Sequence, residues 1–198
     1  MKKHHQHFAL YKPYGYLSQF VNNQTRRKNK KLLGELYKFP NDTMAIGRLD
    51  QDSEGLLLLT TNGKISHQIA SSNYQKEYYV QVDGNITDVA LNALKNSVTI
   101  SIHGKKYNTK PCIAERLLEI PNFAERSKKI RADKHGQTSW IKMILTEGKF
   151  RQIRKMTAKM GFPTLRLVRV RVGNYMLKNM NVGEVREISI ASDTNMFL

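Results

Sequence analysis

The sequence has little cysteine and no long apolar segment. Cys112 is the only cysteine among 198 residues. A single cysteine excludes an intrachain disulfide and a metal site made of several thiolates, and it is typical of proteins from a reducing cytosol. No run of apolar residues is long enough to span a membrane, and residues 1–7 lack the apolar core of a signal peptide. We therefore predict a cytoplasmic protein that does not bind membranes.

Acidic residues are also scarce. There are 33 Lys and Arg residues against 16 Asp and Glu, which gives a formal net charge of +17. An excess of this size predicts a polyanionic partner, with nucleic acid favoured over a membrane surface. A basic protein without such a partner is the alternative that charge alone leaves open.

Hydrophobic patterning predicts a mixed fold in a chain of single-domain length. Strands and helices alternate irregularly, which favours an α+β fold with an extended, mostly antiparallel mixed sheet flanked by helices. We expect residues 1–7 to be a disordered His-rich terminus, residues 8–192 one domain of two halves, and residues 193–198 a tail. The expected strands are at 8–11, 43–46, 56–59, 77–82, 98–102, 112–120, 139–146, 165–172 and 184–190, and the expected helices at 32–37, 64–70, 87–96 and 151–160.

The segment Gly47–Leu59 places acidic residues directly before four leucines. A run of aliphatic residues bounded by turn residues predicts a buried strand. Asp50 is then expected on a tight loop beside a packed strand, where a rigid scaffold can hold a reactive group. An ordinary surface turn is the alternative, because Asp, Ser and Gly are common turn formers.

The same carboxylates raise the question of a metal. Asp50, Asp52, Glu54 and Gly55 imitate the first half of a calcium-binding loop, whose sixth residue is glycine. Leucines follow, however, and Thr61 occupies the twelfth position, where such a loop needs a bidentate Glu. We therefore predict no metal site, although the carboxylates alone leave a magnesium-dependent nuclease open.

Basic residues are concentrated in three segments. From Gly148 to Gly183 there are nine basic residues and no acidic one. In the helix expected there, cationic residues recur on one face and apolar residues on the other. Phosphates of a bound nucleic acid would offset the repulsion between the like charges. The cationic face comprises Arg151, Arg154, Lys155 and Lys159, and the apolar face comprises Ile153, Met156 and Met160. The second basic segment is 24–31, with Arg26, Arg27 and Lys28. The third is a loop at 121–137, which we expect to be mobile.

Three motifs, in order along the chain, resemble the signatures of pseudouridine synthases of the RsuA branch. They are Gly47–Thr60, Lys76–Val80 and Glu147–Met156. The turn Lys12–Gly15 at the start of the chain fits the same family, as do segments near the end, so the match covers residues 8–190. Many members carry a small RNA-binding module of the S4 type before the catalytic domain, which we expect to be absent here.

The resemblance implies the pseudouridine synthase fold with a catalytic cleft across the middle. It also implies isomerisation of uridine to pseudouridine in large-subunit ribosomal RNA by a monomeric enzyme without a cofactor. Asp50 corresponds to the nucleophile, Arg154 to its cationic partner and Tyr78 to the ring that stacks on the target base. The uridine must be flipped out of folded RNA, and Arg48 resembles the residue that enters the vacated space.

The implied contacts to the RNA backbone come from the basic segments and from one strand. A non-catalytic RNA-binding or ribosome-assembly factor on the same scaffold is the alternative function. The residues expected to bind the backbone are Arg26, Arg27, Lys28, Lys149, Arg151, Lys155, Lys159 and Arg169.

Overall fold

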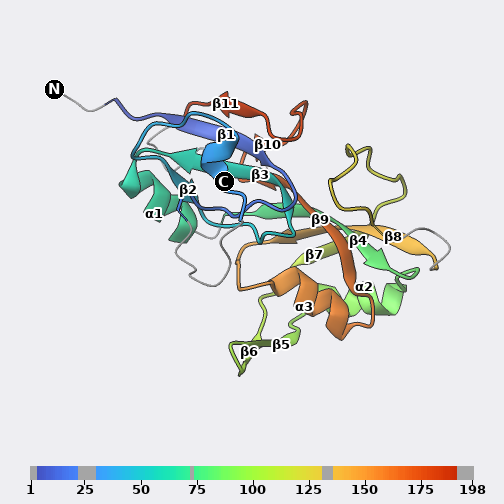
Figure 1. Ribbon diagram of the computed structural model, residues 1–198. Coiled ribbons are helices and arrows are strands. Elements are labelled where there is room, and N and C mark those ends of the chain that lie inside the picture. Colours follow the sequence, from blue (N-terminus) through green and yellow to red (C-terminus); the bar gives the residue numbers. More distant parts are fainter. Residues whose placement is uncertain (1–3, 22–29, 72–73, 131–135, 191–198) are drawn as a thin grey trace. The chain divides into compact units, whose positions relative to one another are not determined.

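The computed structural model describes residues 4–21, 30–71, 74–130 and 136–190 (Figure 1). The chain divides into two compact units: unit 1 consists of Met1–Tyr74 and Gly173–Leu198, and unit 2 of Gln75–Val172. Each contains antiparallel strands together with helices, so the predicted α+β class is confirmed. None of the helices in the described residues has the length and apolar character needed to cross a membrane.

Unit 1 is built on two strands that are buried along their whole length. The first, β1 (His7–Lys12), pairs antiparallel with β3 (Glu54–Thr60). Leu56 to Leu59 are buried, and burial of each of these side chains stabilises the folded state by roughly 1.5–3 kcal/mol. The remaining elements of unit 1 are the 3-10 turn η1 (Leu33–Glu35), β2 (Met44–Ile46) on β3, α1 (Gly63–Ser71) on β2 and β3, β10 (Tyr175–Met176), and β11 (Val185–Glu187) on β1.

The predicted buried strand at 56–59 is confirmed and extends by two residues before the leucines and one after them. The first strand begins at His7 rather than Phe8, because His7 lies opposite Thr60 and its Nδ1 is 2.8 Å from the Thr60 hydroxyl. The strand expected at 184–190 is shorter than predicted. Only Val185–Glu187 pair with β1, and the chain continues to Ile190 without strand geometry.

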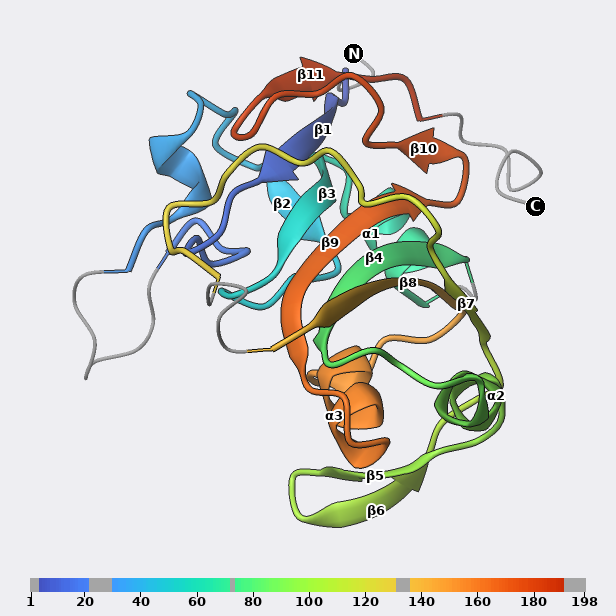
Figure 2. The same ribbon diagram turned by 90° about the vertical axis from the view of Figure 1, so that its right-hand side faces the viewer.

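Unit 2 contains an antiparallel sheet with strand order β9-β4-β8-β7. Burial alternates along β4, so that Tyr78, Val80 and Val82 face the core. The α3 helix contacts both β9 and the separate hairpin β5–β6, and Figure 2 shows it between them. The bounds are β4 (Lys76–Asp83), α2 (Asp88–Lys95), β5 (Thr99–Ile102), β6 (Lys105–Asn108), β7 (Ile113–Arg116), β8 (Thr138–Leu145), α3 (Gln152–Lys159) and β9 (Thr164–Val172).

One predicted strand of unit 2 was wrong in extent, and one strand of unit 2 was not predicted. The strand expected at 112–120 ends at Arg116, and the apolar residues beyond it, Leu118 and Ile120, are 94% and 82% exposed. The strand β6 was not predicted, because its two lysines are exposed and break the apolar alternation that marks a strand. By contrast, the helix expected at 87–96 is confirmed as α2, and Thr87 caps it by accepting a hydrogen bond from the Ala90 N–H.

The basic loop at 121–137 was expected to be mobile. Its first residues, however, are held to the sheet of unit 2 by ring contacts and a hydrogen bond. The Phe123 ring packs against Tyr79 and Trp140, at centroid distances of 6.1 and 5.8 Å. Arg166 lies over the same ring and donates a hydrogen bond of 2.9 Å to the Ala124 carbonyl. The beginning of this loop is therefore an ordered cover on one face of the sheet. Residues 131–135 lie outside the described ranges.

Candidate active site

Asp50 lies on the short loop that joins β2 to β3 in unit 1, and its side chain is half-buried. The loop begins at Gly47, whose φ of +70° is a left-handed conformation that glycine adopts without a steric penalty. It closes on itself where the Ser53 N–H donates to the Asp50 carbonyl at 3.0 Å. The Asp50 carboxylate is thus presented from a tight turn directly before a fully buried strand, as the sequence predicted.

A buried serine holds the residue before Asp50. The Ser18 hydroxyl donates to the Leu49 carbonyl at 2.8 Å and accepts from the Leu49 N–H at 3.0 Å. Both residues are less than a tenth exposed. One side chain therefore satisfies both backbone groups of Leu49, which restricts the direction in which the chain enters the turn.

Two further contacts hold the residues after Asp50. Gln51 and Gly15 are joined twice, through the Gly15 N–H to the Gln51 carbonyl at 2.8 Å and through Gln51 Nε2 to the Gly15 carbonyl at 3.0 Å. The Lys12 ammonium is fully buried and donates to the carbonyls of Ser53 and Pro13, at 2.7 and 3.0 Å. A charged donor in a buried site makes strong hydrogen bonds. The turn is thus held on both sides of Asp50.

Sequence reasoning did not find these supporting residues. Lysine is almost never fully buried, so nothing in the local pattern marks Lys12 as an internal hydrogen-bond donor. The one available signal was the motif Lys12–Gly15, which was interpreted as a turn with no further role. Ser18 lies 31 positions before Leu49 and carries no pattern of its own.

The other predicted residues of this loop differ in exposure. Arg48 is exposed, as a residue that enters RNA must be. Asp52 is half-buried and Glu54 is 1% exposed. The sequence assigns these two carboxylates no catalytic role, and we predict that they fix the loop through hydrogen bonds.

In unit 2, Tyr78 lies on the buried face of β4 and is 9% exposed. Its partner across the β4–β9 ladder is Arg169, and the register shifts between Glu77 and Tyr78 because β9 carries one extra residue there. Such bulges redirect side chains and are common beside active sites. Arg169 is 3% exposed, which differs from the surface position expected of a phosphate contact. Burial, and the Arg169 charge after it, lower the pKa of the neighbouring Lys76.

The α3 helix carries the third motif. It begins at Gln152 rather than at the predicted Arg151, because Arg151 has a φ of +52° and is not helical. Ile153 and Met156 are buried, as predicted for the apolar face. Arg154 is half-buried, and its guanidinium donates to the Thr164 carbonyl at 3.3 Å, which ties the helix to the start of β9. Lys149 and Lys159 are exposed, and Lys155 is half-buried.

The predicted site residues are distributed over both units. Arg48 and Asp50 belong to unit 1, whereas Tyr78, Arg154 and Arg169 belong to unit 2. Within unit 2, Tyr78 and Arg169 are direct cross-strand neighbours. The predicted backbone contacts Arg26, Arg27 and Lys28 lie outside the described residues.

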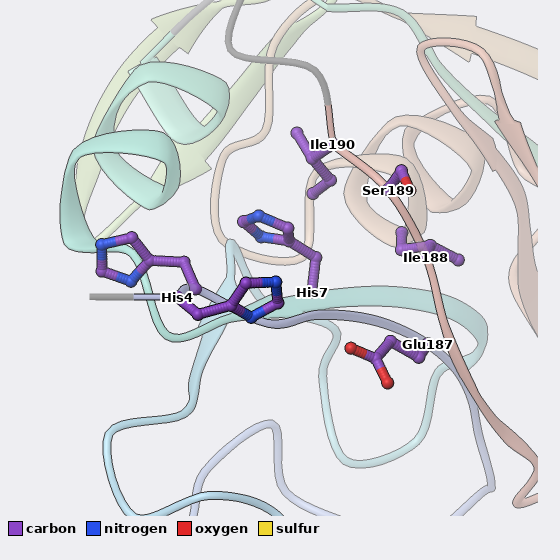
Figure 3. Close-up of a pocket in the computed structure, with 7 residues that line it drawn as sticks. His4, His7, Glu187, Ile188, Ser189 and Ile190 are labelled. Carbon is purple, nitrogen blue, oxygen red and sulfur yellow. The ribbon is translucent and has the colours of Figure 1, made fainter. Parts of the chain in front are cut away.

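A separate pocket of about 360 Å³ lies in unit 1 between the start of β1 and the segment that follows β11. Figure 3 shows His4 and His7 on one side and Glu187 to Ile190 on the other. Burial lowers the pKa of His7, with a further contribution from His5. Over the described ranges no three His, Cys, Asp or Glu side chains are grouped so as to hold a metal ion, and this pocket is no exception.

Comparison with known proteins identifies the family. The sequence profile of RNA pseudouridylate synthases matches residues 6–159. The chain therefore belongs to the RNA pseudouridylate synthase family, which confirms the predicted family, fold and class of enzyme, an isomerase.

Individual relatives resemble nearly the whole chain. Ribosomal large subunit pseudouridine synthase E of Xanthomonas campestris pv. campestris is 40% identical over 179 residues, which cover 89% of this chain and 92% of the relative. The protein of the same name from Vibrio vulnificus is 38% identical over 183 residues, covering 91% of this chain and 74% of the relative. The crystal structure of a pseudouridylate synthase superposes with a TM-score of 0.73 at 25% identity, and the match covers 94% of this chain and 71% of that structure.

Proposed function

We propose that this protein isomerises uridine to pseudouridine at a specific position of large-subunit ribosomal RNA. The observation that carries the proposal is similarity, over about nine-tenths of the chain, to proteins named for that reaction and that RNA. The net charge of +17 supports a polyanionic substrate. We further propose that the enzyme works as a cytoplasmic monomer.

Asp50 is the nucleophile in this proposal. A catalytic carboxylate must be ionised, accessible and fixed in direction. The turn that presents it is held by Ser18 on one side and by Lys12 and Gln51 on the other. Arg154 is the cationic partner that favours the ionised form.

The reaction rearranges atoms within one nucleotide. The bond from ribose C1′ to uracil N1 breaks, the base turns, and C1′ bonds to C5. The C5 proton then leaves to water and N1 gains a proton, so the product is an isomer and no cofactor is consumed. Tyr78 stacks on the detached base and assists proton removal from C5.

The target uridine is flipped out of the RNA before this step, at a cost of a few kcal/mol. Arg48, which is exposed on the Asp50 loop, enters the vacated space and stacks there through its planar guanidinium. Lys149, Arg151, Lys155 and Lys159 bind backbone phosphates, which position the RNA without reading its sequence. Arg169 is buried and lies opposite Tyr78 on the neighbouring strand, so we propose that it positions Tyr78 and does not bind phosphate.

Release of tritium from ribosomal RNA labelled at uridine C5 tests the proposal, because formation of the C1′–C5 bond expels that hydrogen. We expect release by the wild-type protein and none by Asp50→Asn, with RNA affinity of the variant within a few-fold of wild type. Asp88→Asn, an exposed aspartate of α2, is the matched control and should release tritium normally. A wild-type protein that binds ribosomal RNA but releases no tritium would instead support the non-catalytic alternative.

A further inference from the structure

The hairpin β5–β6, which has no part in the proposed function, forms one surface with the start of α3. The two are joined by the Glu147 carboxylate, which accepts hydrogen bonds from the Tyr107 hydroxyl at 2.5 Å, the Lys110 N–H at 2.8 Å and Gln152 Nε2 at 2.6 Å. The bond to Glu147 raises the pKa of Tyr107. Lys155 also donates to the Ser101 carbonyl at 2.7 Å. The hairpin is therefore fixed against α3 by contacts from both of its strands and from the segment after it.

Charge on this surface is of one sign. Glu147 is the only acidic residue in 99–110 and 147–160, and its carboxylate oxygens are occupied by the three donors. Lys105 and Lys106 are exposed on β6, and Lys149 is exposed before α3. Lys149 lies over the Tyr107 ring at 5.0 Å from its centroid. These two segments therefore carry an excess of positive charge.

Two stacked rings lie among these lysines. His103, at the tip of the hairpin, and Phe150, just before α3, are 5.4 Å apart with an interplanar angle of 18°. His103 is exposed, and Phe150 is 53% exposed. The Phe150 ring also has Lys155 over it, with Nζ 4.9 Å from the ring centroid, so the ring is half-exposed among cationic side chains.

The backbone adds an independent observation. Three non-glycine residues in the described ranges have a positive φ, and two of them are at this stack: His103 at +49° and Arg151, next to Phe150, at +52°. A left-handed conformation costs roughly 1–2 kcal/mol for a residue with a Cβ. Strained residues of this kind cluster at binding and catalytic sites. The His103 value belongs to the two-residue turn of the hairpin, where a positive φ at both residues is the favoured geometry, whereas Arg151 is the residue directly before α3.

We propose that His103, Phe150, Lys105 and Lys106 form a hairpin platform that binds an unpaired stretch of the RNA substrate by base stacking and phosphate contacts. Exposed rings among lysines suit single-stranded nucleic acid, because every base has a face that stacks and every linkage carries a charge. A paired helix hides its base faces and would use only the lysines. The proposal rests on the proposed function in taking RNA as the substrate, and it adds a contact outside the catalytic residues.

Two double variants separate the parts of the hairpin platform. His103→Asn with Phe150→Leu removes both rings, while asparagine suits the left-handed turn and leucine keeps an apolar side chain. Lys105→Gln with Lys106→Gln removes two exposed charges. Lys38→Gln with Lys64→Gln, two exposed lysines of unit 1, is the charge-matched control. Thermal melting monitored by circular dichroism reports whether each variant is folded.

Binding is measured by fluorescence anisotropy over a range of salt, with a labelled oligoribonucleotide of about ten nucleotides and an abasic strand of equal length. The ring variant should bind the oligonucleotide about 5- to 20-fold more weakly than wild type, and the abasic strand equally well. The Lys105/Lys106 variant should lower the slope of log affinity against log salt by about 1.4, at about 0.7 per phosphate contact. The control pair should leave both quantities unchanged.

Ring variants that bind the oligonucleotide within about twofold of wild type would overturn the platform, as would equal losses on the intact and the abasic strand. An unchanged salt slope in the Lys105/Lys106 variant would remove the phosphate contacts from the proposal. None of these measurements needs turnover. If the wild-type protein releases no tritium, the proposed function is refuted whatever the binding data show. If the wild-type protein releases tritium but the ring variant binds the oligonucleotide as tightly as wild type, only the hairpin platform is refuted.

Discussion

Ser18→Ala tests whether the Asp50 loop is held as the structure indicates. The substitution removes one hydroxyl and with it both hydrogen bonds to Leu49. The Leu49 N–H and carbonyl then lose the hydrogen bonds to Ser18, and because Leu49 is only 6% exposed, water does not readily replace them. An unsatisfied buried polar group costs about 1–3 kcal/mol, and partial relaxation reduces the sum, so we expect the free energy of unfolding to fall by about 2–4 kcal/mol. For a chain of this size each kcal/mol lowers the melting temperature by about 2–4 °C.

The effect on turnover should be larger than the effect on RNA affinity. Leu49 precedes the nucleophile, and a displacement of about 1 Å in a reacting group costs on the order of a hundredfold in rate. We therefore expect kcat for tritium release to fall about ten- to a hundredfold while KM changes little. Single-turnover kinetics at saturating enzyme, below the melting transition, separates this loss from unfolding.

Ser53→Ala is the matched control on the same loop. Ser53 is 1% exposed, yet over the described residues its hydroxyl has no hydrogen-bond partner. Its removal should leave stability and turnover unchanged or raise stability slightly. If Ser18→Ala behaved like Ser53→Ala, with wild-type melting and wild-type kcat, the reasoning about how this loop is held would be refuted.

Three further predictions concern buried polar groups. Lys12→Met should lower the free energy of unfolding by about 2 kcal/mol in chemical denaturation, because the Ser53 carbonyl loses a charged donor; unchanged stability would count against this contact. The pKa of His7 is lowered in the fold, so the unfolded chain binds the proton first as pH falls. Stability should therefore decline below about pH 6.5, and less so in His7→Asn; identical pH profiles would contradict this. Burial raises the pKa of Cys112 to about 11, so iodoacetamide at neutral pH should label native protein far more slowly than unfolded protein, and equal rates would refute its burial.

The sequence predicted the parts of the fold that local patterns encode. The leucines after Asp50 identified β3, and the alternation from Glu77 to Val82 identified β4. The opposition of charged and apolar positions gave α3. In each case the pattern reports which side of an element is buried, and burial is the main source of stability.

The remainder depends on contacts between residues far apart in the chain. Ser18 and Leu49 lie 31 positions apart in the chain, and the buried Lys12 ammonium donates hydrogen bonds to the carbonyls of Ser53 and Pro13. Neither contact leaves a periodic signal. The hairpin strand β6 was missed for a related reason, since its stability comes from the contacts of Tyr107 with Glu147 and not from an apolar face. The residues that hold the Asp50 loop could therefore not be predicted from the sequence, although the position of Asp50 on a tight loop before a buried strand could.

The central claim is that Asp50 catalyses pseudouridine formation at one position of large-subunit ribosomal RNA. Its most direct test is a pseudouridine map of that RNA from cells that lack the gene, complemented with the wild-type or the Asp50→Asn gene. One pseudouridine should be lost in the deletion, restored by wild type and not restored by Asp50→Asn. An unchanged map in the deletion, or full restoration by Asp50→Asn, would contradict the claim.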